Sequence, residues 1–199
     1  MKIRFALAAV ALVAAGGLAA QALTKMTQGA DEAEMMKKWM EFATPGEGHK
    51  QLADKAGKWN MKVKMIMAPG APAEESPATS EVKWIMDGRF LEDHTQGEFQ
   101  GMPFVGLGHL GYDNMKKKYV GTWMDNMGTA IMTMEGTYDA KTKTFNYTGE
   151  MPDVMAGVSK KNRTTEKIVD KDNWVMSSYA TGPDGKEYLA MEITYTRAK

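Results

Sequence analysis

The chain contains no cysteine, only three histidines and no net charge at pH 7. Without cysteine it has no disulfide, no thiolate metal site and no cysteine nucleophile. A lipid anchor on a leading cysteine is excluded for the same reason. The 25 basic residues equal the 25 acidic ones, so charge gives no argument for binding nucleic acid or an anionic membrane surface.

The common enzyme motifs are absent as well. The sequence has no Gly-x-Ser-x-Gly elbow, no His-Glu-x-x-His pair, no phosphate loop and no dinucleotide fingerprint. Cys-x-x-Cys-His is also missing, which excludes covalent c-type haem. These absences exclude the common motif-defined hydrolases but not catalysis in general. A non-enzymatic role is favoured, and no cofactor is expected.

Residues 1–22 have the pattern of a secretory signal peptide. Lys2 and Arg4 give a positive start, residues 5–13 an apolar run, and Ala20-Gln-Ala22 a small-residue cleavage site. Cleavage would leave 177 of the 199 residues, with a formal charge of −2. The mature protein is expected to have no transmembrane segment and to lie in the periplasm or outside the cell. The alternative is a retained membrane anchor, but a spanning helix needs about 20 apolar residues and this run is shorter.

Residues 23–56 are predicted to form a leader and an N-terminal helical segment. After a leader over 23–30, Asp31 is a suitable N-cap for a helix over 31–43, and Pro45 follows its end. A second short helical turn stops at Gly57. The first helix is amphipathic because its apolar residues recur at the spacing of one helix face: Met36, Trp39, Met40 and Ala43.

From residue 57 to 199 the hydrophobic period changes to two, which predicts β-strands. A Pro/Ala/Glu-rich loop is expected over 69–77. Ten strands joined mostly by tight turns favour a single antiparallel up-and-down barrel of the lipocalin type, since closure removes both sheet edges. A two-sheet sandwich is the alternative, and many charged strand residues argue against an outer-membrane barrel. The expected strands are 59–67, 79–87, 89–99, 103–112, 117–126, 129–138, 144–151, 159–169, 173–181 and 187–197.

The segment 101–113 is unusually rich in glycine for a strand. Several glycines in one strand indicate sharp bending or a close approach of another group to the backbone. Gly88-Arg-Phe90 precedes this segment, and Trp123-Met-Asp125 and Gly136-Thr-Tyr-Asp139 follow it. In this order the motifs resemble the secreted bacterial family called domain of unknown function 1579, over roughly residues 50 to 197. The resemblance implies an exported β-barrel and supplies no established site.

Arg89 and Asp125 are the charged candidates for a site. If both point inward, they would form a buried pair or bind the head group of an amphipathic ligand, because a buried charge must be matched. At the rim of the barrel they would be ordinary strand-end residues. The three histidines, His49, His94 and His109, are far apart in the sequence; His109 is interpreted as an exposed or hydrogen-bonded strand residue rather than a haem ligand.

Methionine is abundant, with 19 residues. Thioethers are soft ligands suited to Cu(I), but these methionines follow strand alternation, which favours a core or an apolar pocket. The leading hypothesis is therefore a barrel that binds a small apolar or amphipathic ligand. The first alternative is a structural or interaction protein of the cell envelope, which could form a homo-oligomer. The second, less favoured, is a haem- or copper-binding barrel. The candidate ligand-binding residues are Trp84, Arg89, Phe104, Trp123, Asp125, Met132, Met134 and Tyr147. Met86 is a further candidate for the lining of the barrel.

Overall fold

The computed structural model describes residues 29, 31–154 and 156–199. The expected signal peptide and most of the expected leader lie outside these residues. The chain forms two compact units, Met1–Thr44 and Pro45–Lys199. In the first unit, residues 31–43 form the expected helix, and the side chains of its Met36, Trp39 and Met40 are more than half exposed. No helix in the described part of the chain is both long and apolar enough to cross a membrane.

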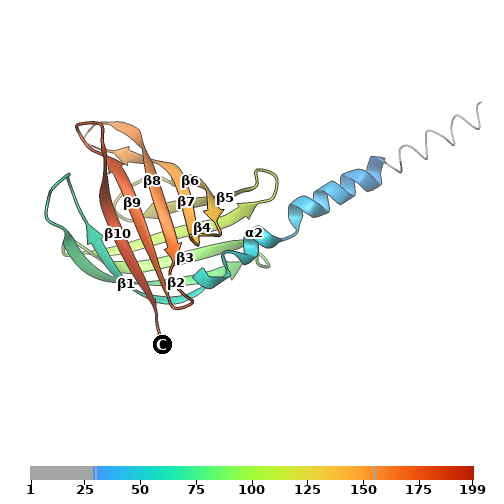
Figure 1. Ribbon diagram of the computed structural model, residues 1–199, viewed down its shortest axis with the longest axis horizontal. Helices are drawn as coiled ribbons and strands as arrows, with labels where there is room; N and C mark the ends of the chain where they lie inside the picture. Colours follow the sequence, from blue (N-terminus) through green and yellow to red (C-terminus); the bar gives the residue numbers. More distant parts are fainter. Residues whose placement is uncertain (1–28, 30, 155) are drawn as a thin grey trace, which may run out of the picture. The chain divides into compact units, whose positions relative to one another are not determined.

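In the second unit ten antiparallel strands close into a barrel (Figure 1). Each strand pairs with the next along the chain, and β10 pairs back onto β1. The predicted closed up-and-down topology is therefore confirmed, and the two-sheet alternative is wrong. The strands are β1 (Gly57–Met65), β2 (Glu74–Ile85), β3 (Phe90–Phe99), β4 (Met102–Asp113), β5 (Lys118–Asp125), β6 (Met132–Asp139), β7 (Thr144–Asp153), β8 (Val158–Ile168), β9 (Asn173–Thr181) and β10 (Glu187–Arg197).

The first two strands differ from the expected ones. β1 ends at Met65 rather than residue 67, and β2 already begins at Glu74, inside the expected loop. The loop expectation rested on composition, whereas the pairing with β1 continues through this polar stretch. A salt bridge of 2.8 Å between Lys62 and Glu75 joins the two strands on the solvent side.

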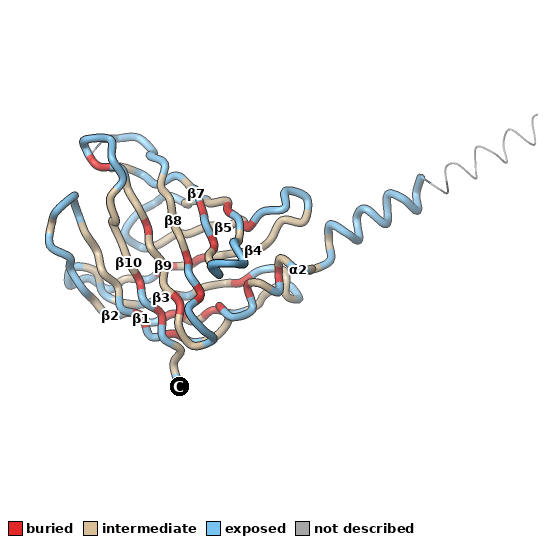
Figure 2. The backbone as a smooth tube through the Cα atoms, in the orientation of Figure 1, coloured by how far each residue is buried: buried red, intermediate tan, exposed pale blue. Residues whose placement is uncertain are grey.

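One end of the barrel is plugged by the segment before β1, which contains α2 (Glu47–Lys50) and the 3-10 turn η1 (Ala53–Lys55). Leu52, between them, is fully buried in the core. Gly48 lies so close to Tyr112 that a Cβ atom there would overlap the ring, and the His49 ring meets the same tyrosine edge-on at 5.9 Å. The buried segments concentrate toward this end (Figure 2).

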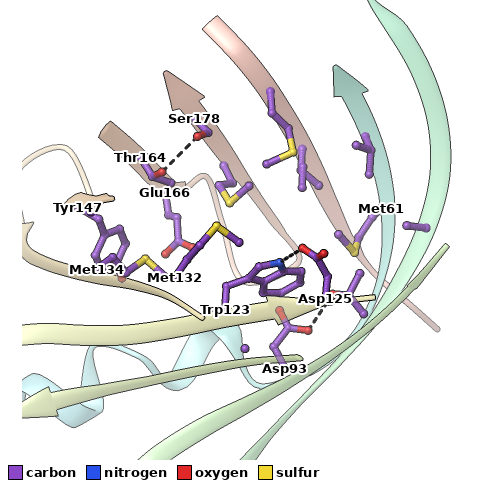
Figure 3. A pocket seen from close by; sticks show the side chains of 18 of the residues that line it. Met61, Asp93, Trp123, Asp125, Met132, Met134, Tyr147, Thr164, Glu166 and Ser178 are labelled. Carbon is purple, nitrogen blue, oxygen red and sulfur yellow. Dashed lines mark hydrogen bonds between the residues drawn. The ribbon is translucent and has the colours of Figure 1, made fainter. Parts of the chain in front are cut away.

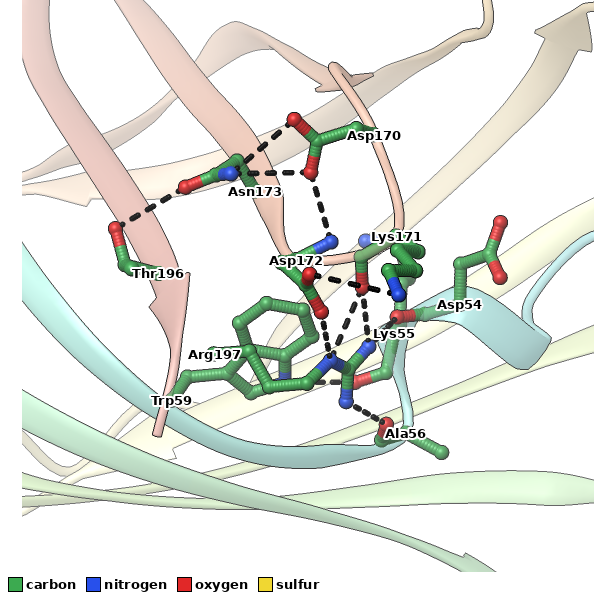
Figure 4. Close-up of polar contacts among 10 residues, drawn as sticks. All are labelled: Asp54, Lys55, Ala56, Trp59, Asp170, Lys171, Asp172, Asn173, Thr196 and Arg197. Atoms are coloured by element: carbon green, nitrogen blue, oxygen red, sulfur yellow. Dashed lines mark hydrogen bonds and ion pairs between the residues drawn. The ribbon is translucent and has the colours of Figure 1, made fainter. Parts of the chain in front are cut away.

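Arg197, near the end of β10, fastens this plug to the barrel (Figure 4). Its guanidinium covers the Trp59 ring at 4.2 Å and pairs with the carboxylate of Asp172 at 3.3 Å. It also donates hydrogen bonds of 2.7 to 3.0 Å to backbone carbonyls of the plug and of the β8–β9 turn. The three carbonyls belong to Asp54, Ala56 and Lys171. Such a fork of contacts needs the planar arginine group.

Candidate functional site

The barrel interior contains a cavity of about 460 Å³. It extends from Lys55 and Tyr195 at the plugged end to Met127 and Met151 at the opposite end. Met127 and Met151 are partly exposed, at 40 and 37%, so the cavity reaches the solvent there. Because strand residues alternate between the two faces, alternate residues of the strands face the barrel interior, apart from a register shift in β10 between Leu189 and Met191.

The cavity wall is mainly apolar and unusually rich in methionine. Long unbranched thioether side chains adapt their shape to different apolar partners. Met132 and Met134, from neighbouring positions on the inner face of β6, lie beside Tyr147 (Figure 3). The methionines that line the cavity are Met61, Met65, Met127, Met132, Met134, Met151, Met176 and Met191.

Trp123 on β5 occupies the space that the glycines of β4 leave free. A Cβ atom at Gly106 would overlap its indole, and one at Gly108 would lie 3.1 Å from it. The indole nitrogen donates a hydrogen bond of 2.9 Å to Asp125, and the ring stacks on Phe104 with a centroid separation of 6.5 Å. The glycine-rich strand and the Trp-x-Asp motif are therefore two halves of one packing arrangement.

A buried ion pair lies at the plugged end of the cavity. Lys55 from η1 reaches inward and pairs with the carboxylate of Glu166 on β8. The Lys55 ammonium also lies over the Trp174 ring, 4.1 Å from its centroid. Both charged side chains are almost fully buried, at 4 and 10% exposure. A buried charge is tolerated only when it is matched in this way.

Asp93 on β3 is another carboxyl group that lines the cavity, and it is half-buried. Ser80 and Thr95 donate hydrogen bonds of 2.6 and 3.0 Å to the same oxygen, Oδ1. Burial nevertheless outweighs these contacts and raises the pKa of Asp93 above its ordinary value. The positive charge of Lys55 lowers this pKa, and the negative charge of Glu166 raises it. The three charged groups therefore form one electrostatic cluster.

Two hydrogen-bond donors that line the cavity have no partner. Among the described residues, the Tyr147 hydroxyl and the Trp174 indole nitrogen are buried without an acceptor in hydrogen-bonding geometry. Tyr147 is 1% exposed and Trp174 4%. Burial raises the pKa of Tyr147 well above its ordinary value, and the Glu166 carboxylate, which lies near the hydroxyl but outside hydrogen-bonding geometry, adds to this effect. Buried polar groups are normally paired, so two such donors beside one cavity are informative.

Six of the eight predicted site residues line the cavity. Trp84 and Arg89 do not. Trp84 packs against the core, and Arg89 donates a hydrogen bond of 3.1 Å to the backbone carbonyl of Met86 in the β2–β3 turn. The six lining residues are Phe104, Trp123, Asp125, Met132, Met134 and Tyr147.

The hypothetical pair between Arg89 and Asp125 does not form. Asp125 pairs in register with Gly106 of β4, whereas Phe90, next to Arg89, pairs with Gly111. Five positions along a strand correspond to roughly 17 Å at about 3.3 Å per residue. Arg89 instead lies near His49, whose pKa is lowered first by burial and then by the arginine charge.

The histidines do not assemble a metal site. His49 accepts a hydrogen bond of 3.1 Å from the backbone nitrogen of Gly46 within the plug. His94 and His109 flank Glu92 on the outer wall, at 2.8 and 3.4 Å, which agrees with the interpretation of His109 as a strand residue. In the described part of the chain, no three acidic, histidine or cysteine side chains are grouped to hold a metal ion.

The charged cluster was missed by the sequence analysis. Lys55 belongs to a short helical turn, and Glu166 lies 111 residues away from it, so nothing local connects them. Asp93 did carry a signal, because Leu91 and Phe99 share its strand parity. Apart from Phe90 at its start, the other parity of this strand is polar, so Leu91 and Phe99 indicate the inward face.

Comparison with known proteins identifies the family. The sequence profile of "Protein of unknown function (DUF1579)" matches residues 44–197. The chain belongs to this DUF1579 family. The family resemblance seen in the sequence is thus confirmed, and the match covers the plug and the whole barrel. No curated protein matches the DUF1579 chain.

Among solved structures, the DUF1579 barrel is similar to the crystal structure of Rv2717c from M. tuberculosis. The TM-score is 0.58 at 14% identity, over 78% of this chain and 100% of the other. A redesigned β-barrel also matches, with a TM-score of 0.37 at 12% identity, over 79% of this chain and 100% of that one. The likeness to Rv2717c concerns the fold alone.

Proposed function

We propose that this protein binds one small, mainly apolar molecule inside its barrel and acts as a binding protein rather than an enzyme. The observation that carries this proposal is the cavity itself. Small barrels are either filled by their own side chains or hold one ligand, and here about 460 Å³ stays unfilled. That volume lies within the roughly 300 to 1,000 Å³ of small-molecule sites, and the methionine-rich wall suits an apolar occupant.

The open end of the barrel supports the same function. Five connections lie at this end in the up-and-down topology, and exposed large apolar side chains occur in three of them and at the first residue of β4. Such residues provide an apolar path between an external source of ligand and the cavity. The exposed residues at this end include Met67, Met102, Met127, Ile131 and Val154.

A blocking substitution tests the proposal. Ala180 lines the cavity, so Ala180→Trp would place an indole in the ligand's space. We expect the uncharged fluorophore N-phenyl-1-naphthylamine to bind the wild-type protein at one site, and to bind this variant at least tenfold more weakly. Thr181→Trp adds the same ring to the exposed outer face of β9 and is the matched control. Equal binding by both variants would refute an interior site.

We further propose that the protein is exported and works in the periplasm or outside the cell. The support is the signal-like sequence of residues 1–22, with its charged start, apolar run and small-residue cleavage site. The test is the mass of the mature protein from its own cells, which we expect to begin at Leu23. An intact N-terminus on the mature protein would contradict export by cleavage.

A second candidate function is self-association through the N-terminal helix. The observation in its favour is the exposure of Met36, Trp39 and Met40 on the helix over 31–43, because a solvent-exposed apolar stripe is typical of interaction surfaces. Light scattering of the mature protein and of a Met36→Ser/Trp39→Ser variant tests it. A wild-type monomer would rule this function out.

A further inference from the structure

The unpartnered donors indicate what a ligand must supply at the plugged end of the cavity. Tyr147 pairs in register with Thr164 of β8, and Trp174 pairs with Ile168. Glu166 lies between these two positions on the same strand, so the donors flank the ion pair of Lys55 and Glu166. Figure 3 shows Tyr147 and Glu166 reaching into the cavity from neighbouring strands. An acceptor atom placed here would satisfy a donor that is otherwise buried without a partner.

The cation at this end already has its partner within the protein. Lys55 is neutralised by Glu166, and Asp93 accepts two hydrogen bonds from Ser80 and Thr95. A ligand carboxylate would therefore meet two protein carboxyl groups and gain no free cation. A ligand ammonium would stand beside Lys55 and leave both donors without an acceptor. Burying a ligand carboxylate would cost free energy that no free cation returns, and burying an ammonium would add a second cation beside Lys55.

An uncharged oxygen has neither difficulty. A carbonyl oxygen accepts from Tyr147 or Trp174, and a hydroxyl group can in addition donate to a carboxylate oxygen. We infer that the plugged end is a subsite for the hydroxyl or carbonyl group of an otherwise apolar ligand, recognised by Tyr147 and Trp174. This inference rests on the proposed ligand-binding function and names its ligand class: long-chain alcohols, ketones and related neutral molecules. Their apolar part would lie along the methionine-rich wall.

The test uses the complete mature protein and probes of matched chain length. The probes are 1-decanol, 2-decanone and 1-chlorodecane, which lacks an oxygen, with decanoate and decylamine as ionic counterparts. Binding is measured by displacement of N-phenyl-1-naphthylamine. Tyr147→Phe is the informative variant, because it removes only a hydroxyl group that has no acceptor in hydrogen-bonding geometry. Tyr179→Phe is the control, since Tyr179 lies under Arg163, at 3.7 Å on the outer wall.

We expect Tyr147→Phe to weaken 1-decanol and 2-decanone about fivefold, the loss typical of one hydrogen bond. Binding of 1-chlorodecane and the fluorophore should change less than about twofold, and Tyr179→Phe should change none of them. The urea midpoint of Tyr147→Phe should not fall, whereas a structural hydroxyl would lower it.

Two results would overturn the subsite. The first is an unchanged affinity of Tyr147→Phe for 1-decanol and 2-decanone. The second is wild-type binding of decanoate or decylamine as tight as that of 1-decanol. In both cases the proposed function survives if the fluorophore still binds and Ala180→Trp still blocks it. If the wild-type protein binds neither the fluorophore nor any of the probes, the proposed function itself fails.

Discussion

The indole of Trp123 lies against the backbone of Gly106 inside the barrel, in space that any side chain at residue 106 would fill. The pair joins β4 to β5 and explains why a glycine-rich strand precedes a Trp-x-Asp motif. It also sets the shape of the cavity, because both Trp123 and Asp125 line it.

Gly106→Ala should therefore destabilise the barrel. The added Cβ overlaps the indole, and overpacking of this kind typically costs about 1 to 3 kcal/mol in the free energy of unfolding. Urea unfolding measures the loss, and a shift in tryptophan emission reports the displaced ring. Gly128→Ala is the control, since nothing lies within 4 Å of the Cβ position there. A wild-type urea midpoint for Gly106→Ala would contradict the packing described.

Lys55→Met should be more costly than the loss of an exposed lysine. It leaves the buried Glu166 carboxylate without its partner, and breaking one side of a buried pair costs about 3 to 5 kcal/mol. Adding Glu166→Met removes the stranded charge, so the double variant should recover much of the stability. Lys58→Met breaks a solvent-exposed pair with Glu81 and should cost less than about 1 kcal/mol. A double-mutant cycle in urea measures the coupling, and additive losses would contradict it.

Asp93→Asn tests the raised pKa of Asp93. Native Asp93 keeps its proton at pH values where the unfolded chain has lost it, so the native state binds more protons. Its contribution to the free energy of unfolding therefore falls as pH rises from the ordinary carboxyl pKa through the raised one. Asp93→Asn carries no titrating group at this position. Its free energy of unfolding should therefore rise relative to that of the wild type as pH increases over this interval.

The stability difference between the two proteins, measured by urea unfolding from pH 4 to 8, isolates this residue. A difference is needed because, among the described residues, six other carboxyl groups have lowered pKa values, and their contributions to stability are lost as pH falls. Those groups are Glu75, Glu81, Glu92, Glu135, Asp139 and Asp170. A difference that does not vary with pH would contradict the raised pKa of Asp93.

Arg197→Lys should loosen the plug. Lysine keeps the charge but cannot reach three carbonyl groups or cover Trp59 with a planar group, so we expect a loss of about 2 kcal/mol. Thermal unfolding measures it. Arg163→Lys is the comparison, because Arg163 pairs with Glu187 on the solvent-exposed wall and should lose less than about 1 kcal/mol. Equal losses would show that the Arg197 contacts do not hold the plug.

The barrel could be predicted from the sequence because its signals are local. Alternation in β1, with Met61, Val63 and Met65 inward, and turn residues between strands are read over a few positions. The helix over 31–43 was visible for the same reason. The error at β2 came from judging residues 69–77 by composition alone, where pairing with β1 decides the structure.

The inner end of the cavity could not be predicted because it depends on distant contacts. Lys55 and Glu166 meet only when the plug folds over the closed barrel. Arg89 was predicted as a site residue from the Gly-Arg-Phe motif, but it belongs to the β2–β3 turn. Trp123, Met132, Met134 and Tyr147 were expected in the interior because aromatic and thioether residues at one strand parity are typical of it, and all four line the cavity. Their parity did not show that a cavity remains between them.

The most direct test of the central claim is a native mass spectrum of the protein purified gently from its own cells. The account predicts one extra mass per chain, of a size compatible with a neutral, mainly apolar molecule. That mass should be retained by Thr181→Trp and lost by Ala180→Trp. A bare chain, or an extra mass retained equally by Ala180→Trp, would contradict a ligand held inside the barrel.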